Sequence, residues 1–326
     1  MSEPLLSIVM PVFNAEPFIF EAVSSLLNQS FNNFELIIVD DGCTDKSIDI
    51  VKSFSDERIR VIANEQNSGI VFSRNRGTEI TRGRYVAPFD ADDIAEKDKF
   101  QKQIHFLENN KDYGIIGSWA LLIDENGKNL KKKWKLNAPA DRIPAILLFR
   151  NYFIQSAVVI RREALPADNY TKGFDAVEDY KMWFEISRKY KVWNYPEYLL
   201  NYRIHESSIT QKQKQKMAGR DIKVFDYIFN TLGYDLSDRQ KELLLNIKSD
   251  ELFNESSLIK ETEQFLIYLL RLNRDLQEIN HHELTKVVYN RWLKICFQKK
   301  PFSLRSFRHF ITSPLNQVMV KSLFQK

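Results

Sequence analysis

Three aspartates are crowded into four residues of this chain, at Asp90-Ala91-Asp92-Asp93, directly after the apolar run Arg84–Phe89. Carboxylates this close repel one another, and a divalent cation relieves the repulsion because Mg²⁺ and Mn²⁺ prefer oxygen ligands. Mg²⁺ usually shares one or two carboxylates with substrate phosphates, so the expected chemistry is the binding of a metal and a diphosphate. An isolated motif of this kind is more often a solvated acidic turn, and its position at a strand end favours the functional interpretation.

A second acidic pair, Asp40-Asp41-Gly42, follows another apolar run, Phe34–Val39. One aspartate at such a place is often a helix cap, and two adjacent carboxylates are more than a cap needs. A carboxylate here could accept a hydrogen bond from the N–H of a nucleobase, as acidic side chains do elsewhere. On the residues alone, both interpretations stay open.

The elements that must position these carboxylates can be predicted from the first quarter of the chain. Short apolar runs alternate there with helical periodicities in the order βαβαβαβ, with short connections. This order predicts an α/β fold, with a mostly parallel sheet flanked by helices. In such sheets the ligand binds at the carboxyl ends of the strands. The side chains at these ends are Asp40, Asp41, Asp90, Asp92 and Asp93.

The remaining sequence predicts two regions. We expect a helix from about Lys97 to Asn109, strands at Gly114–Asp124 and Ser156–Arg161, and a helix at Glu178–Tyr190. Beyond Gln211, glycine and proline become scarce while Leu, Ile and Phe recur at helical spacing. The prediction is therefore an N-terminal domain at residues 1–215 and a mainly α-helical C-terminal region at residues 216–326.

The composition is that of an ordinary globular protein, with 326 residues, 44% hydrophobic and 28% charged. Two distant cysteines, Cys43 and Cys296, make no disulfide framework, so we expect free thiols in a reducing compartment. The N-terminus does not have the pattern of a secretory signal, and no run approaches the roughly 18 apolar residues that span a bilayer. The expected location is the cytoplasm, either free or resting on the inner face of the cytoplasmic membrane.

The positive charge is concentrated in the C-terminal tail. From Thr285 onward the chain has nine Lys or Arg and no Asp or Glu, which gives this tail a charge of +9. Since the whole chain has a net charge of +4, the residues before Thr285 are net acidic. Cations mixed with aromatic and aliphatic residues predict an interfacial helix on an anionic membrane, and a basic helix packed on the domain is the alternative. No nucleic-acid partner is expected, because no recognised motif accompanies the charge.

Five segments resemble the motifs of family 2 glycosyltransferases and occur in the expected order. They are Ser7–Asn14, Val39–Asp45, Arg74–Gly77, Phe89–Asp93 and Glu178–Tyr180. The resemblance covers about residues 5–210 and implies a GT-A (Rossmann-like) fold. It also implies inverting transfer of a sugar from a nucleotide-sugar, preferably a UDP-sugar, to a hydroxyl of a glycan or lipid-linked glycan in cell-surface polysaccharide or lipopolysaccharide biosynthesis. The alternative is a non-catalytic nucleotide-sugar-binding or scaffold protein, against which the intact acidic set argues.

The resemblance assigns roles to individual residues. Asp179 corresponds to the catalytic base, although an acid in a first helical turn is also favoured by the helix dipole. The nucleotide-sugar is expected to contact Pro11, Phe13, Asp41, Arg74, Asp90, Ala91, Asp92 and Arg203. The divalent metal, Mn²⁺ or Mg²⁺, is expected to be held by Asp92, Asp90 and His205. Trp119 and Ser156 are candidates for the acceptor side, and Cys43 stands where the family usually has serine.

Overall fold

The computed structural model describes residues 3–206, 208, 217–249, 256–297 and 310–316. The chain forms two compact units. The first unit contains Met1–Ala138 and Tyr152–Gln215, and the second contains Pro139–Asn151 and Lys216–Lys326. Pro139–Asn151 therefore belongs to the C-terminal unit, although the residues before and after it in the sequence belong to the first unit. The prediction of one boundary at residues 215/216 did not include this segment.

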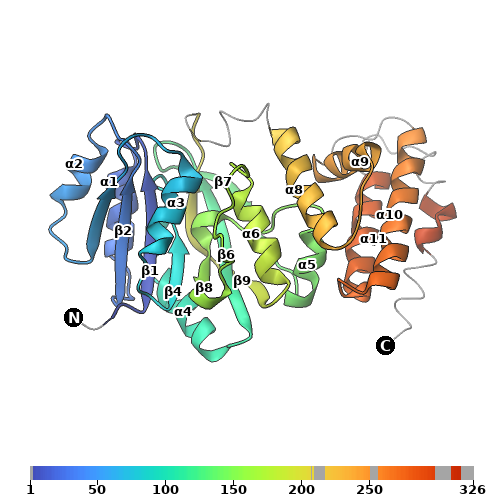
Figure 1. The fold of residues 1–326 in the computed structure, drawn as a ribbon, viewed down its shortest axis with the longest axis horizontal. Coiled ribbons are helices and arrows are strands. Elements are labelled where there is room, and N and C mark those ends of the chain that lie inside the picture. The colour runs from blue at the N-terminus through green and yellow to red at the C-terminus, as the bar shows by residue number, and fades with distance from the viewer. Residues whose placement is uncertain (1–2, 207, 209–216, 250–255, 298–309, 317–326) are drawn as a thin grey trace. The chain divides into compact units, whose positions relative to one another are not determined.

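The first unit is built on a nine-stranded sheet (Figure 1). Its strands are β1 (Leu6–Val12), β2 (Phe34–Asp40), β3 (Ile59–Ala63), β4 (Tyr85–Pro88), β5 (Ile94–Ala95), β6 (Tyr113–Ile123), β7 (Asn129–Trp134), β8 (Val159–Arg161) and β9 (Lys191–Arg203). The order is β3-β2-β1-β4-β8-β6-β9-β5, with β7 paired to β6. The expected parallel sheet is confirmed from β3 to β4, and beyond β4 the sheet is mixed because β8 runs antiparallel to both of its neighbours.

Helices accompany the sheet in the first unit and dominate the second (Figure 1). The first unit contains α1 (Ile19–Leu27), α2 (Ser47–Ser53), α3 (Ile70–Glu79), α4 (Lys99–Asn109) and α6 (Glu178–Ser187). The second contains α5 (Ile143–Ile146), α8 (Met217–Thr231), α9 (Asp238–Ser249), α10 (Ser256–Leu276) and α11 (His281–Phe297). The expectation of a mainly helical C-terminal region is thus confirmed.

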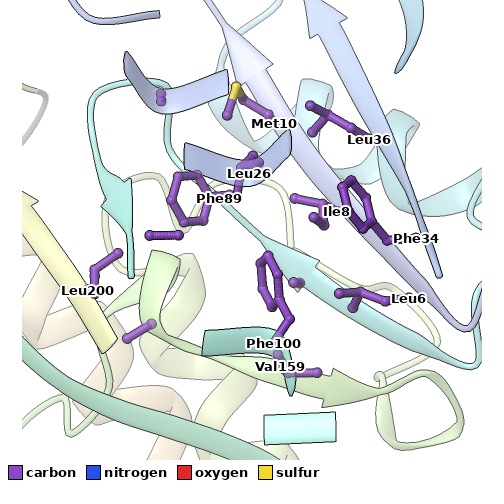
Figure 2. Close-up of a cluster of buried hydrophobic side chains, with 14 of the residues drawn as sticks. Leu6, Ile8, Met10, Leu26, Phe34, Leu36, Phe89, Phe100, Val159 and Leu200 are labelled. Carbon is purple, nitrogen blue, oxygen red and sulfur yellow. The ribbon is translucent and has the colours of Figure 1, made fainter. Parts of the chain in front are cut away.

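Strand β1 is buried along its whole length because it has helices on both faces. Figure 2 shows Ile8 and Met10 in one cluster with Leu26 of α1. On the other face, α3 lies so close that a Cβ at Gly77 would come 2.4 Å from Val9 Cγ1. Burying side chains such as Ile8 and Met10 stabilises the fold by about 1.5–3 kcal/mol each, so the strand ends are firmly held.

The described part of the basic tail is only partly buried, because Phe297 is 38% exposed and Ile311 is 57% exposed. Trp292 and Ile295 of α11, which were expected on an interfacial face, are buried within the C-terminal unit. Tail residues 298–309 and 317–326 lie outside the described residues, including Phe302, Arg305 and Arg308. In the described part of the chain, no helix combines the length and apolarity needed to cross a membrane. Cys43 and Cys296 are both free thiols.

A buried carboxylate fastens β2 to its neighbours. Glu35 accepts hydrogen bonds from Ser7 Oγ at 2.7 Å, from Arg60 Nη1 at 2.7 Å and from Arg82 Nη2 at 2.8 Å. Burial acts to raise the pKa of Glu35, but the hydrogen bonds from Ser7, Arg82 and Arg60 outweigh burial and lower that pKa. A lowered pKa in the folded state means that Glu35 stabilises the fold above its ordinary pKa and loses this effect as the pH falls.

We therefore expect Glu35→Gln to lower the free energy of unfolding at pH 7 by about 1–3 kcal/mol, because buried hydrogen bonds to a charged group are lost. The difference from the wild type should shrink once the pH falls below the ordinary value of 4.5. Urea denaturation at pH 7 and in acid measures both effects, with Glu79→Gln, an exposed acid, as the control. Equal stability of the Glu35 variant and the wild type at pH 7 would contradict the assignment.

Candidate active site

The acidic loop Asp90–Asp93 follows the carboxyl end of β4, as predicted. The backbone N–H of Phe89 still donates to the carbonyl of Val9 at 2.9 Å, so the loop begins where the sheet pairing ends. The next N–H, that of Asp90, donates to Ser156 Oγ at 3.0 Å. Ser156 is fully buried, so the structure places it in support of the acidic loop, a role that its sequence context does not reveal.

Arg74 of α3 joins this loop to another helix. Its Nη2 donates to Asp90 Oδ1 at 2.7 Å, and its Nη1 pairs with Glu178 Oε1 in the first turn of α6. The side chain of Arg74 is 8% exposed, and its Cζ lies 5.5 Å from the ring centroid of Tyr170. The arginine expected near a diphosphate is therefore a buried bridge between two carboxylates that are 88 positions apart in the sequence.

One guanidinium serves two carboxylates in this bridge. Burial raises the pKa of Asp90 and also that of Glu178, while Arg74 opposes both shifts. Asp92 adds to the raised pKa of Asp90 because two negative charges lie close together. The excess of carboxylates over cations around Arg74 makes this a place where a divalent cation would be stabilised.

Asp92 and His205 lie side by side, although one follows β4 and the other follows β9. Asp92 Oδ2 and His205 Nε2 are 2.8 Å apart, and the imidazole packs at 4.5 Å from the ring of Phe18. A carboxylate oxygen and an imidazole nitrogen are both suitable ligands for Mn²⁺. Among the described residues, no group of three or more His, Cys, Asp or Glu side chains is arranged to hold a metal ion. Two protein ligands would therefore need oxygens from the substrate.

Arg203 fixes the acidic loop that contains Asp92. Its Nε donates to the backbone carbonyl of Asp92 at 2.8 Å, and its own N–H donates to Asp93 Oδ1 at 2.9 Å. Its Nη2 pairs with Glu21 Oε2 at 2.6 Å, and the side chain is only 1% exposed. This geometry favours a positioning role for Arg203, because the direct donor contact predicted from the sequence would have to displace these bonds.

Asp41 lies at the carboxyl end of β2, where a nucleobase was expected. Its Oδ1 accepts from Asn64 Nδ2 at 2.7 Å and from the N–H of Ser68 at 2.8 Å, and its Oδ2 accepts from the N–H of Gly69 at 3.0 Å. Asp41 therefore fixes the loop that leads into α3. The preceding Asp40 shapes its own turn, because its Oδ1 accepts from the N–H of Cys43 at 2.9 Å.

Other predicted donor residues lie at the same edge of the sheet. Pro11 is buried in β1 opposite Val39 of β2, so its contribution would be to the floor beneath a base. Phe13, just beyond the end of β1, is 49% exposed and offers an aromatic face at this edge. Ala91, between Asp90 and Asp92, is half-buried and packs against the hydrophobic cluster that contains Ile8 and Met10.

Asp179 is half-buried in the first turn of α6, beside the buried Glu178. Its Oδ1 accepts from the N–H of Tyr180 at 2.6 Å. The turn before the helix contains Ala176 with φ of 65°, in the left-handed region that favours glycine. Strained backbone of this kind is found where the surrounding structure fixes a functional segment. The strained turn and the Arg74–Glu178 pair together determine where Asp179 lies.

Comparisons with known proteins are in keeping with this geometry. Residues 7–166 match the family described as Glycosyl transferase family 2. An uncharacterized glycosyltransferase of Haemophilus influenzae is 30% identical over 304 residues, which cover 86% of this chain and 94% of that protein. The chain belongs to glycosyltransferase family 2.

Other similar proteins have more specific names. The Escherichia coli UDP-Glc:alpha-D-GlcNAc-diphosphoundecaprenol beta-1,3-glucosyltransferase WfgD is 29% identical over 72% of this chain and 90% of its own. The structure of S. aureus TarS in complex with UDP-GlcNAc has a TM-score of 0.56 at 18% identity, over 89% of this chain and 88% of that chain. The structure of mannosyltransferase PcManGT from Pyrobaculum calidifontis, in complex with GDP-Man and Mn²⁺, has a TM-score of 0.55 at 14% identity. This match covers 100% of this chain and 89% of that chain. The predicted GT-A type of α/β fold is thereby confirmed.

Proposed function

We propose that this protein is a metal-dependent, inverting glycosyltransferase. In this proposal it transfers a hexosyl or N-acetylhexosaminyl group from a UDP-sugar to a hydroxyl of a glycan or lipid-linked glycan during the synthesis of a cell-surface polysaccharide. The observation that carries the proposal is the bridge through Arg74, which ties the acidic loop at Asp90 to the helical turn that contains Asp179. In this proposal, the Arg74 bridge holds the donor site and the base in fixed relation to each other.

The choice of donor and acceptor rests on similar proteins. WfgD is named for UDP-Glc and for a diphosphoundecaprenol acceptor, and the TarS structure contains UDP-GlcNAc. In this chain, the uridine would lie over Pro11 beside Phe13, near Asp41 at the carboxyl ends of β1 and β2. The diphosphate would lie toward the acidic loop, where Asp90, Ala91 and Asp92 follow β4.

Asp92 and His205 are the residues that would hold a divalent metal, with Asp90 balancing the charge of Arg74 beside them. When bound, the metal would neutralise charge that develops on the departing diphosphate. Arg203 keeps the loop in place through its bond to the Asp92 carbonyl. The protein therefore supplies a preorganised site, and such preorganisation is the main source of electrostatic catalysis.

The proposed reaction is a single displacement. The Asp179 carboxylate takes the proton of the acceptor hydroxyl as that oxygen forms a bond to the anomeric carbon. The bond from that carbon to the diphosphate oxygen breaks, and its electron pair leaves with UDP. The configuration at the anomeric carbon is inverted because the new bond forms on the face opposite the leaving group. A second catalytic carboxylate is not required, because the diphosphate is already a good leaving group.

A donor screen with the full-length chain tests the proposal. We expect release of the nucleoside diphosphate from a UDP-sugar in the presence of Mn²⁺ or Mg²⁺, and none after chelation with EDTA. Asp92→Ala should lower this metal-dependent turnover by about 10²–10³-fold. The control is Asp98→Ala, which removes an exposed carboxylate six positions later and should leave the turnover unchanged. Full activity in Asp92→Ala would refute the metal assignment, and failure to turn over UDP-, GDP- and dTDP-sugars would refute the activity.

A further inference from the structure

A strongly basic segment lies on the surface of the first unit, outside the site described above. Every residue from Lys128 to Lys135 is exposed, and this segment includes β7 (Figure 1). We call Lys128–Lys135 the basic strand. It contains no acidic residue and five lysines, which are Lys128, Lys131, Lys132, Lys133 and Lys135. Among the described strands β7 pairs with β6, over the stretch of β6 from Ala120 to Ile123.

Aromatic rings accompany these lysines. Trp119 of β6 and Tyr198 of β9 lie with ring centroids 5.3 Å apart. Lys135 Nζ lies 4.4 Å from the Trp119 ring centroid, and Lys133 Nζ lies 5.4 Å from that of Tyr198. The rings thus stabilise two of the lysines through cation–π contacts while leaving them on the surface.

The basic strand also exposes two large apolar side chains. Trp134 is 38% exposed and Leu130 is 37% exposed, each between lysines in the sequence. Lysines on an edge strand also discourage association with other strands, but that purpose gains nothing from an exposed indole. Tryptophan and leucine among lysines are typical of surfaces that rest in the headgroup region of an anionic bilayer.

The basic strand is tied to the acidic loop through one residue. Arg203 Nη1 donates to the carbonyl of Glu125 at 2.9 Å and to that of Asp124 at 3.3 Å, in the turn between β6 and β7. The same guanidinium donates through Nε to the carbonyl of Asp92. The turn that starts the basic strand and the loop that would bind the donor are therefore held at the same end of the sheet.

We propose that the basic strand is the surface through which this protein docks on an anionic phospholipid membrane. Lys132 shares a face of β7 with Trp134, two positions away, so its ammonium meets the lipid headgroups while Trp134 and Leu130 enter the interface. Charge complementarity and the exposed apolar pair favour a membrane over a nucleic acid, which would offer no apolar layer. This docking is independent of the sugar-transfer activity, and it would place the acidic loop near the membrane.

Sedimentation of the full-length chain with vesicles tests the proposal. We expect binding to vesicles that contain phosphatidylglycerol, weak binding to pure phosphatidylcholine, and loss of binding at high salt. Lys131→Gln/Lys132→Gln should weaken the binding by about 25-fold, at roughly fivefold for each lysine near an anionic surface. The matched control is Lys46→Gln/Lys52→Gln, with Lys46 directly before helix α2 and Lys52 within it. It removes the same charge from exposed positions and should change binding little.

Tryptophan fluorescence provides a second readout. Anionic vesicles should shift the emission of the wild type to shorter wavelength, and Trp134→Phe should remove most of that shift. The proposal is overturned if the wild type ignores anionic vesicles, or if the two lysine pairs weaken binding equally. It is also overturned if Lys131→Gln/Lys132→Gln binds vesicles normally and instead raises the KM for a diphosphate-bearing acceptor in detergent, because the basic strand would then recognise the acceptor.

Discussion

Asp179→Asn is expected to lower the turnover number by about 10²–10⁴, the usual contribution of a positioned general base. Asparagine has nearly the same shape but cannot take up the proton of the acceptor hydroxyl. It still offers an oxygen to the N–H of Tyr180, to which Asp179 Oδ1 now bonds at 2.6 Å, so the helix start should persist. The affinity for UDP with Mn²⁺, measured by calorimetry, should be unchanged because Asp179 is assigned no contact with the donor.

Asp175→Asn is the matched control for this variant. Asp175 is an exposed carboxylate four positions before Asp179 and outside the helix, so its variant should retain full activity. Glu178 is the rival base, because burial raises its pKa to about 7. Its side chain is nevertheless 4% exposed and paired with Arg74, so a substrate hydroxyl would have to displace that arginine. Persistent transfer by Asp179→Asn would mean that another group acts as the base.

Arg74→Ala is expected to lower the free energy of unfolding by about 3–5 kcal/mol, because it leaves buried carboxylates without their cation. Glu178 is the most affected, since the pair with Arg74 is almost fully buried. Asp90 loses its ion pair as well, so the acidic loop is no longer tied to α6. Transfer should fall together with stability, and urea denaturation measures the first effect directly.

Arg76→Ala is the control from the same helix. Arg76 is half-buried and donates to the carbonyl of Ala63 and to Oδ1 of Asn64, so its loss should cost about 1–2 kcal/mol, as for two ordinary hydrogen bonds. Arg74→Met/Glu178→Met should recover part of the stability lost in Arg74→Ala, because an apolar pair replaces one buried charge pair. A loss below about 1 kcal/mol for Arg74→Ala would show that the bridge does not hold the site together.

The sequence was sufficient to predict the strands that carry the site. Runs such as Phe34–Val39 are apolar throughout, which is typical of strands buried on both faces, and β2 forms there as Phe34–Asp40. Since β1, β2 and β4 are parallel, the prediction that Asp41 and Asp90 follow strand ends at one edge of the sheet also holds in the structure. The pairing of Asp92 with His205 was expected only from the resemblance to a family.

The contacts that organise the site could not be predicted from local patterns. Ser156 reaches the backbone of Asp90, and Arg203 reaches the carbonyl of Asp92, from segments 66 and 111 positions away. Periodicity and spacing report only on neighbours within a few turns or strands, so they carry no signal for these contacts. The family resemblance had instead suggested that Arg203 contacts the donor, and Ser156 had been a candidate for the acceptor side. The antiparallel pairing beyond β4 could not be predicted for the same reason. Strand β8 has only three residues, and its direction depends on tertiary packing.

The anomeric configuration of the product tests the central claim most directly. The full-length chain would be supplied with a UDP-α-sugar, Mn²⁺ and a lipid-diphosphate glycan acceptor, and the new linkage read from its anomeric coupling constants by NMR. A single displacement assisted by Asp179 predicts a β-linked product. An α-linked product would contradict the account, because retention requires chemistry that a lone base does not provide.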